Sequence, residues 1–340
     1  MTAPLDLVTG GSGLTGRALV QRLLADGRRV RVLDLEPLDV PQVELILGDV
    51  RDADAAARAC AGVDTVYHTV AVVTQHPVKT PLIRAVNVGG TQNMLAAAQR
   101  AGVARFVFTS SIDVVFDGSD IAAGDESLPY AENFLDAYGR SKADAERLVL
   151  AANGQDGMAT LSLRAAGIFG PHDRHRLPVA LRYIRANGNV PMGNGSARFS
   201  HVFVDNLVHA HVLAGRSLTL DSPSAGRAYF ITDHPATNFF AFLAPYLEAV
   251  GVGPARFSLP APLAWGLGCA SEAFYIVFGR FIRIDPVMTR YTVAAVCRDF
   301  WFVHDAATRD FGYQPIVSAD EAFVRTLAWL RETDAQAAAK

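Results

Sequence analysis

Through the first half of the chain, short apolar runs rich in β-branched residues alternate with longer amphipathic stretches. Strands of a parallel sheet give such runs because helices cover both of their faces. The predicted strands are 5–9, 30–35, 43–47, 65–70, 105–110 and 159–163, and the predicted helices include 14–26, 91–101 and 138–152. The alternation predicts an α/β fold built on a Rossmann-type, doubly wound parallel sheet.

The pattern loosens after about residue 169, where prolines and a Gly/Asn-rich stretch at 187–195 break the chain into short elements. A strand and helix over 202–214, a strand over 228–232 and two or three further helices follow. The sequence has no internal repeat and no low-complexity tract between the halves. We therefore expect a doubly wound domain at 1–170 and a smaller region, interleaved with it, at 171–340.

One segment of the second half is almost free of charge. Residues 257–271 include no charged side chain, and Glu272 is followed by seven more uncharged residues. Two prolines and three glycines interrupt a run that would otherwise approach the length of a membrane span, about 20 residues. An apolar helix is expected at about 260–280, and the sequence supports two interpretations of it equally. It lines a pocket or touches a membrane through 257–280, or it packs in the core.

Composition narrows the class of protein. The 340 residues carry 31 basic and 34 acidic side chains, a formal charge of −3, so no overall field attracts nucleic acid. The three cysteines lie far apart, without metal or redox spacing. The N-terminus lacks the basic and apolar regions of a signal peptide, and we expect a cytoplasmic protein.

A glycine-rich turn joins the first predicted strand to the first predicted helix. Gly10, Gly13 and Gly16 follow a GxxGxxG spacing, and Leu14 lies within it. Glycines in this position permit a tight turn, let the backbone approach a pyrophosphate and let the helix pack closely on the strand. The placement between strand and helix predicts a dinucleotide site in residues 1–170.

The carboxylate at the end of the second strand indicates which dinucleotide binds. Asp34 can accept hydrogen bonds from both adenosine ribose hydroxyls and would repel a 2′-phosphate, which favours NAD over NADP. Three arginines at 28, 29 and 31 complicate this prediction, because a nearby Arg accommodates a 2′-phosphate. Asp49 and Val50 follow the third strand and are expected to hold the adenine edge.

A Tyr-x-x-x-Lys spacing on the helix at 138–152 supplies the candidate chemistry. Tyr138 and Lys142 lie on one helical face, four residues apart. A free phenol has a pKa of about 10, so it needs a neighbouring cation to act as a base near neutral pH. Ser110 and Ser111 end the fifth strand, at the sheet edge where ligands bind, and a hydroxyl there can contact the reacting oxygen.

Longer stretches carry a resemblance to a known family. The chain resembles the extended short-chain dehydrogenase/reductases, from TGGSGLTG at 9–16 through YGRSK at 138–142 to FGYQP at 311–315. Within them it is most similar to the branch of 3β-hydroxysteroid dehydrogenases and sterol-4α-carboxylate 3-dehydrogenases (decarboxylating). The segments that carry this resemblance are YHT at 67–69, NVGGTQN at 87–93, FVFTSS at 106–111, LRAAGIFGP at 163–171 and HVFVDN at 201–206.

The resemblance implies roles for individual residues. Tyr138 becomes the general acid/base, and Lys142 lowers its pKa and holds the nicotinamide ribose. Ser111 aligns best with the catalytic hydroxyl, with Ser110 as the neighbouring alternative. Four further residues are implied as cofactor contacts: Asn87, the backbone at Ile168, and His68 and Ala71 at the end of the fourth strand.

The function implied by the resemblance is an NAD-dependent oxidoreductase. It would oxidise the 3β-hydroxyl of a sterol-like or steroid-like apolar substrate to the 3-ketone, with loss of CO2 where the substrate carries a 4-carboxylate. Alternatives are a reductase of long-chain β-ketoacids, a nucleotide-sugar epimerase or dehydratase, and a non-catalytic nucleotide sensor. We expect a homodimer that binds no nucleic acid. His201, His209 and His211 lack a fourth ligand, so no metal site is expected.

Overall fold

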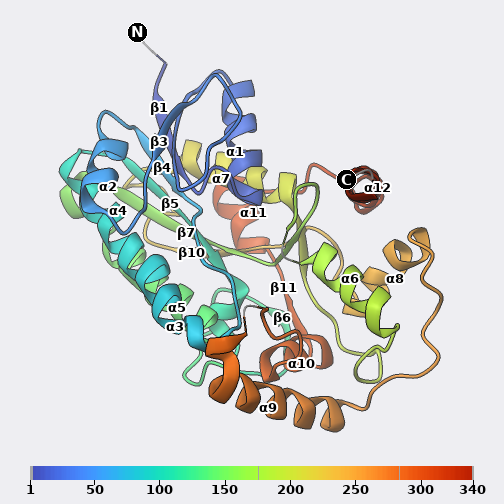
Figure 1. Ribbon diagram of the computed structural model, residues 1–340. Helices are drawn as coiled ribbons and strands as arrows, with labels where there is room; N and C mark the ends of the chain where they lie inside the picture. The colour runs from blue at the N-terminus through green and yellow to red at the C-terminus, as the bar shows by residue number, and fades with distance from the viewer. Residues whose placement is uncertain (1–2, 175, 283, 339–340) are drawn as a thin grey trace.

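Seven parallel strands form the central sheet of the protein (Figure 1). The computed structural model describes residues 3–174, 176–282 and 284–338. The strands lie in the order β10-β7-β5-β4-β1-β2-β3, the doubly wound arrangement with one strand added beyond β7. Their bounds are β1 (Leu5–Thr9), β2 (Arg29–Asp34), β3 (Glu44–Leu47), β4 (Thr65–His68), β5 (Arg105–Ser111), β7 (Ala159–Ala165) and β10 (Ala228–Ile231). The predicted fold class is confirmed.

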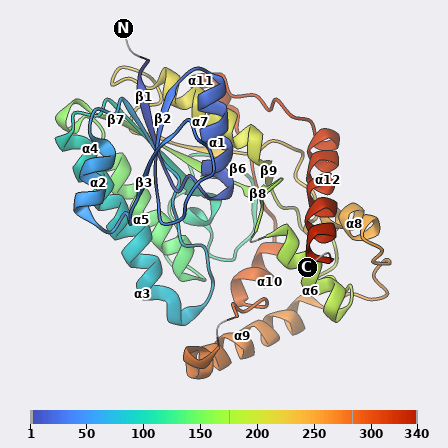
Figure 2. The same cartoon turned by 45° about the horizontal axis from the view of Figure 1, so that its top comes forward.

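Helices cover both faces of this sheet (Figure 2). On one face, α1 (Leu14–Ala25) and α7 (Val204–Ser217) pack beside each other over a core that includes Leu19, Val208 and Val107. On the other face, α2 (Ala53–Cys60), α4 (Thr91–Arg100) and α5 (Ala137–Ala151) enclose a second core. Because both faces of β5 and β7 are covered, nearly all of their residues are buried, as their apolar runs predict.

A continuous helical segment connects β4 to α4. It consists of η1 (Pro77–Lys79), α3 (Thr80–Ile83) and η2 (Arg84–Gly90), and η2 has the wider π-helical winding. β4 ends at His68, two residues before the predicted bound, and the hydroxyl of Thr69 donates to the carbonyl of Thr9 at 2.7 Å. The chain between β4 and η1 therefore leaves the sheet beside the glycine-rich turn.

The second half of the chain contributes to both the sheet and a separate layer. β10 and α7 belong to the sheet layers, whereas α6 (Leu177–Asn187), α8 (Phe239–Ala249) and α12 (Ala319–Ala338) share a cluster of their own. Two strand pairs sit between these parts: β8 (Gly167–Phe169) with β9 (His201–Phe203), and β6 (Ile121–Gly124) with β11 (Phe300–Phe302). The remaining elements are η3 (Ile112–Val115), η4 (Gln155–Gly157), α9 (Ala261–Phe278), η5 (Gly279–Phe281), α10 (Arg290–Cys297) and α11 (Asp305–Phe311).

The turn from β1 into α1 depends on glycine at two positions. Gly10 has a φ of +73°, in the left-handed region that side chains disfavour, and its N–H donates to the carbonyl of Leu33 at 2.9 Å. At Gly16, a Cβ atom would lie 2.0 Å from the carbonyl oxygen of Gly10. The first turn of α1 therefore packs directly on the backbone of the loop, and only glycine permits this contact.

We expect Gly16→Ala to destabilise the protein, because the added methyl must displace backbone. Overpacking of this kind costs about 1–3 kcal/mol of unfolding free energy, which urea titration measures. Gly89→Ala is the matched control, since a Cβ atom at Gly89 meets open space inside a helix. That substitution should be neutral or stabilise by about 0.4–1 kcal/mol. Equal midpoints for the two variants would contradict the packing described here.

Candidate active site

The predicted site residues gather at one edge of the sheet. Because every strand pair in the sheet is parallel, the carboxyl ends of β1, β2, β4, β5 and β7 face the same side. Ligands of doubly wound sheets bind in the crevice outside these ends. The glycine turn follows β1, Asp34 ends β2, Ala71 lies beyond β4 and Ser111 ends β5.

Asp34 fits a ribose-binding role and braces the glycine turn. One carboxylate oxygen accepts a hydrogen bond from the Ser12 backbone N–H at 2.8 Å, and the other accepts from the Glu36 N–H at 2.9 Å. Asp34 is half-buried, so its carboxylate lies at the mouth of the turn. A negative charge is thus fixed where an adenosine ribose would meet the loop.

The three arginines that complicated the cofactor prediction lie at the other end of β2. The guanidinium of Arg28 donates to both carboxylate oxygens of Asp6, at 2.5 and 2.7 Å. Arg29 and Arg31 pair with Glu44 at 2.6 and 2.8 Å. Their charges are therefore paired in the first half of the strand, away from Asp34, and do not offset the preference of that carboxylate for NAD.

Four other predicted cofactor residues lie around the same edge. Asp49 pairs with Arg51 at 2.5 Å, and this hydrogen bond lowers the pKa of the Asp49 carboxyl. Val50 is buried against Gly90, where a Cβ atom would approach it to 2.6 Å. Leu14 and Ile168 pack on one small cluster, which brings the glycine turn next to β8.

His68 is turned away from the edge. Its ring is buried beneath the sheet, with Nδ1 2.8 Å from the Thr9 hydroxyl and Nε2 3.0 Å from the Thr91 hydroxyl. Burial lowers the pKa of His68 to about 3, and the charge of Lys142 adds to this effect. The neutral side chain supports the sheet, and only the backbone of this segment is left to face a cofactor.

Asn87 links the chain after β4 to α5. Its side-chain oxygen accepts from the Val72 N–H at 2.8 Å, and its amide donates to the Val72 carbonyl at 3.1 Å and the Ser141 hydroxyl at 2.9 Å. The Ser141 hydroxyl in turn donates to the Tyr138 carbonyl at 2.7 Å. The predicted cofactor residue Asn87 therefore also fixes the helix that carries Tyr138.

Tyr138 and Lys142 project from the first turns of α5, as their spacing predicts. The Lys142 ammonium is buried, donates to the Thr109 carbonyl at 2.5 Å and lies 4.1 Å from the Phe108 ring centroid. Burial lowers the pKa of Lys142 to about 7, and the carboxylate of Glu146 opposes this shift. Near neutral pH, Lys142 is therefore present in both its charged and its neutral form.

The phenol of Tyr138 is held in its protonated form by the protein itself. Burial raises its pKa, and the carboxylates of Asp113 and Asp136 raise it further, while a hydrogen bond with Ser111 acts in the opposite direction. Asp136 caps α5 by accepting from the Gly139 N–H at 2.8 Å, and burial raises the pKa of Asp136 to about 7. The lowering of the Tyr138 pKa by Lys142 stays a prediction for the cofactor-bound enzyme.

Two residues of this site escaped the sequence analysis. The hydroxyl of Ser111 donates to one oxygen of Asp113 at 2.6 Å, and the phenol of Tyr291 donates to the other at 2.6 Å. Asp113 is buried, and burial raises its pKa. A carboxylate two residues after Ser111, inside an apolar run, was a visible signal in the sequence. Tyr291 gave none, because it is 178 residues away.

The structure separates the two candidate serines. Ser111 contacts Asp113 and Tyr138, whereas Ser110, the previous residue of β5, points to the opposite face, toward Glu146. The Glu146 carboxylate is paired with Arg164 at 2.8 Å and accepts from the Ser162 hydroxyl at 2.7 Å. This geometry favours Ser111 as the hydroxyl beside the phenol.

Within the described part of the chain, no three His, Cys, Asp or Glu side chains are arranged to hold a metal ion. His201 lies on β9, whereas His209 and His211 lie on α7. The ring of His211 is 2.7 Å from the Thr109 hydroxyl and donates to the Leu207 carbonyl at 2.8 Å. It therefore ties α7 to β5.

Comparison with known proteins agrees with this geometry. A sequence model of the 3-beta hydroxysteroid dehydrogenase/isomerase family matches residues 7–261. The chain is 38% identical over 335 residues to a 3 beta-hydroxysteroid dehydrogenase/Delta 5→4-isomerase of Mycobacterium tuberculosis, covering 95% of this chain and 89% of that protein. It is 35% identical over 328 residues to the human sterol-4-alpha-carboxylate 3-dehydrogenase, decarboxylating, covering 95% and 87%.

Solved structures show the same fold. A short-chain dehydrogenase/reductase superfamily protein from Agrobacterium tumefaciens, crystallised with bound NAD, has a TM-score of 0.73 at 23% identity over 99% of this chain and 100% of that chain. A dTDP-glucose 4,6-dehydratase from Streptomyces venezuelae, with NAD bound, has a TM-score of 0.74 at 24% identity over 96% and 97%. At these identities the likeness concerns the fold alone.

The pKa of Lys142 predicts how stability depends on pH. Between about pH 7 and 10.5 the unfolded chain binds a proton that the folded protein does not, so this group makes the protein more stable as pH rises. Below pH 7 the ammonium is charged in both states, and the full cost of burying it remains. We expect Lys142→Met to raise the melting temperature at pH 6.5, by about 1–2 °C for each kcal/mol gained in a chain of 340 residues.

The same substitution should flatten the rise in melting temperature between pH 7 and 10. Lys79→Met is the control, because it removes a lysine that is 39% exposed and paired with Asp285 at the surface. Differential scanning calorimetry at pH 6.5, 8 and 10 gives both comparisons. A Lys142→Met protein that melts below the wild type at pH 6.5 would show that the buried ammonium is net stabilising.

Proposed function

The chain belongs to the 3-beta hydroxysteroid dehydrogenase/isomerase family, and from this we propose that it is an NAD-dependent oxidoreductase that oxidises the 3β-hydroxyl of a sterol-like substrate. The observation that carries the proposal is the hydrogen bond between Ser111 and Tyr138 at the carboxyl edge of the sheet, with Lys142 one turn along the same helix, in a chain whose relatives are named for this reaction. Fold alone would not support it, because the same fold serves nucleotide-sugar enzymes.

The chain's own residues divide the chemistry as follows. NAD, when bound, supplies the hydride acceptor and a positive charge beside the phenol. Tyr138 takes the proton of the substrate hydroxyl as the hydride leaves the carbinol carbon. The Ser111 hydroxyl, which donates to Asp113 in the structure, would turn to donate a hydrogen bond to the substrate oxygen as its proton passes to Tyr138. Lys142 stabilises the phenolate form of Tyr138.

The cofactor is assigned to residues 1–170. The turn at Gly10, Gly13, Leu14 and Gly16 fits a pyrophosphate, since it places the N-terminus of α1 directly after β1 and its glycines have no side chains that would keep a phosphate from the backbone. Asp34 would accept the ribose hydroxyls. The other proposed contacts are Asp49 and Val50 at the adenine, the backbone at His68 and Ala71, Asn87, and Ile168 at the carboxamide, with Tyr138 and Lys142 at the nicotinamide ribose.

The substrate and a membrane surface are assigned to residues 171–340. Of this region, 261–281 forms a helix long and apolar enough to cross a membrane by length and composition, yet only 11% of it is buried. One face of α9 packs on the protein through Ala264, Gly268 and Glu272, and Arg290 donates to Glu272 at 2.7 Å. A helix held in this way lies along a surface and does not span it.

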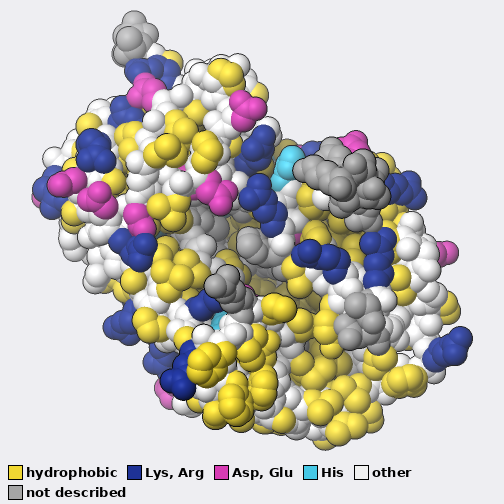
Figure 3. Space-filling model, viewed as in Figure 1, with side chains coloured by type: hydrophobic (Ala, Val, Ile, Leu, Met, Phe, Trp, Pro, Cys, Tyr) yellow, Lys and Arg dark blue, Asp and Glu magenta, His cyan; other side chains and the backbone are white. Residues whose placement is uncertain are grey.

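The outer face of α9 and its flanks form a broad apolar surface (Figure 3). Its most exposed side chains are Phe257, Leu263, Leu267, Phe274, Ile276, Val277, Phe278, Phe281 and Ile284. Soluble monomers rarely expose a contiguous apolar patch of this extent. We assign it to peripheral contact with lipid, from which a sterol would enter the site. A homodimer is also expected, and light scattering checks it.

Tyr138→Phe removes the proton acceptor and keeps the ring. General acid–base catalysis contributes about 10²–10⁴-fold, so kcat for a 3β-hydroxysterol should fall by that order while the Kd of NAD changes little. Cofactor reduction at 340 nm and NAD titration measure the two quantities. Tyr130→Phe is the matched control, because Tyr130 lies against Arg147 and Arg164, away from Ser111. Near-normal turnover of the Tyr138 variant would rule the assignment out.

A charge on the outer face of α9 should release the protein from lipid. Phe274→Asp and Ile276→Asp change side chains that are 50% and 67% exposed, so folding should be unaffected. We expect the wild type to float with phosphatidylcholine/phosphatidylserine vesicles and each variant to lose at least about tenfold in partitioning. Leu220→Asp is the control, because Leu220 is 47% exposed and lies outside the segment 257–284 that forms the apolar surface. It should float like the wild type. No flotation of the wild type would contradict the membrane assignment.

A further inference from the structure

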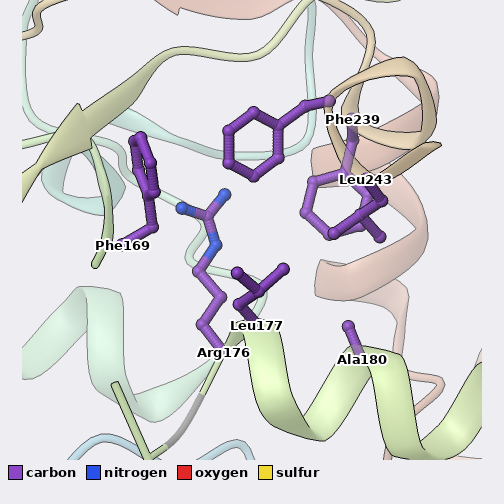
Figure 4. Close-up of a pocket in the computed structure, with 7 residues that line it drawn as sticks. Phe169, Arg176, Leu177, Ala180, Phe239 and Leu243 are labelled. Atoms are coloured by element: carbon purple, nitrogen blue, oxygen red, sulfur yellow. The ribbon is translucent and has the colours of Figure 1, made fainter. Parts of the chain in front are cut away.

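A buried guanidinium lies without a partner beside the proposed active site. Arg176 immediately precedes α6, and its Nη1 and Nη2 atoms are buried with no hydrogen-bond partner among residues 3–174, 176–282 and 284–338. Figure 4 shows its guanidinium between the rings of Phe169 and Phe239. Its Cζ lies 4.9 Å from the centroid of Phe199 and 5.7 Å from that of Phe239. An unpaired buried charge is costly, so this group indicates a missing anion.

Gly167 makes room for this guanidinium. A Cβ atom at Gly167 would lie 2.0 Å from Nη1 and 2.3 Å from Cζ of Arg176, so the charged group occupies the place of a side chain on β8. Gly167 pairs with His201 across β8 and β9, which places the His201 ring next to the guanidinium. Both ring nitrogens of His201 are also buried without a partner in the described structure. Arg176 and His201 are therefore neighbouring buried polar groups, and the charge of Arg176 acts on the His201 ring.

The nearby carboxylates do not fill it. Asp173 accepts from the backbone N–H groups of Arg176 and Leu177, at 3.0 and 2.8 Å. Asp113 accepts from Ser111 and Tyr291. The charges of both still reach Arg176, but neither accepts a hydrogen bond from its terminal nitrogens.

The position lies close to the reacting atoms. Ala165 pairs with Ser111 in the sheet, and Gly167 follows Ala165 by two residues. Burial raises the pKa of Asp113, the carboxylate that holds the Ser111 hydroxyl, and the charge of Arg176 acts against this shift, so the two groups are within electrostatic reach. An anion held by Arg176 would therefore lie near the carbinol carbon of the substrate.

We propose that Arg176, with His201 beside it, is the subsite for a carboxylate carried by the substrate next to its reacting alcohol, so that the preferred substrate is an apolar β-hydroxy acid. This rests on the proposed function. A planar guanidinium offers two parallel N–H donors that match a carboxylate, and the surrounding aromatic rings exclude water and strengthen the pair. A neutral alcohol would leave the charge of Arg176 unpaired, so the site would select acids over neutral alcohols.

Binding requires a local movement. The cavity bordered by Arg176, Phe169, Phe239 and Leu243 measures about 10 Å³, which holds about one water. A carboxylate must therefore displace the Phe239 ring or draw the guanidinium toward the substrate. An internal water as the only partner of Arg176 is the competing explanation, and the experiment below separates the two.

The test compares two variants on matched substrates with NAD. Arg176→Met removes the charge at similar length, and Arg176→Lys keeps the charge without the planar fork. Arg182→Met, at an exposed site on α6, is the control. The substrates are a 3β-hydroxysterol, the same sterol with a 4α-carboxylate, and a straight-chain 3-hydroxy acid. The two acids distinguish a sterol source of the carboxylate from a fatty-acid source.

We expect the wild type to prefer an acid over the neutral sterol. Arg176→Met should lower kcat/KM for that acid by about 10²-fold, mainly through KM, and change the neutral sterol by less than threefold. Arg176→Lys should fall between them, and Arg182→Met should match the wild type. As a second readout, the acid should raise the melting temperature of the wild type more than that of Arg176→Lys.

Each contrary result has a definite meaning. If the wild type oxidises none of the three substrates, the proposed function itself fails. If it oxidises the neutral sterol and Arg176→Met leaves the acid-to-neutral ratio of kcat/KM unchanged, the carboxylate subsite is wrong. An equal loss with both substrates shows a purely structural guanidinium and overturns the subsite as well.

Discussion

The active-site edge is organised around one buried ammonium. Lys142 lies inside the protein against the Thr109 carbonyl and the face of Phe108, where its charge is expensive to hold. The same low-dielectric surroundings raise the pKa of Tyr138 and keep His68 neutral. Removing water makes each of these groups sensitive to any further charge. A positively charged nicotinamide ring bound beside the phenol would therefore lower the pKa of Tyr138 far more than it would in water. Without that ring, the phenol stays protonated.

The apolar outer helix and the reacting hydroxyl are connected by neighbouring residues. Glu272 on α9 holds Arg290, and the next residue, Tyr291, donates to Asp113, which receives the Ser111 hydroxyl. The chain of contacts runs from the exposed apolar side of the molecule to the Ser111 hydroxyl without a gap. The apolar surface on α9 and the Ser111 hydroxyl are thus both fixed by α10, through Arg290 and Tyr291.

The sequence predicted what depends on local order. The six strands that the first half gives to the central sheet were found because burial on both faces requires continuous apolar runs. Tyr138 and Lys142 were found because an α-helix repeats every 3.6 residues. β6 and β11 were missed, since each has only three or four residues and they pair across almost 180 positions. Tyr291 and Arg176 were missed for the same reason. Their roles depend on contacts with residues elsewhere in the chain, and no local spacing in the sequence predicts such contacts.

The last strand of the sheet comes late in the chain, and this shapes how the protein is made. β7 ends at Ala165, but its outer neighbour β10 ends at Ile231, about 66 residues later. At a synthesis rate of 5–20 residues per second, β7 emerges roughly 3–13 s before its partner. During that interval its outer row of backbone groups is open to other nascent chains. The growing chain on the ribosome therefore passes through a stage in which β7 is an open sheet edge, and β10 closes that edge in the finished fold.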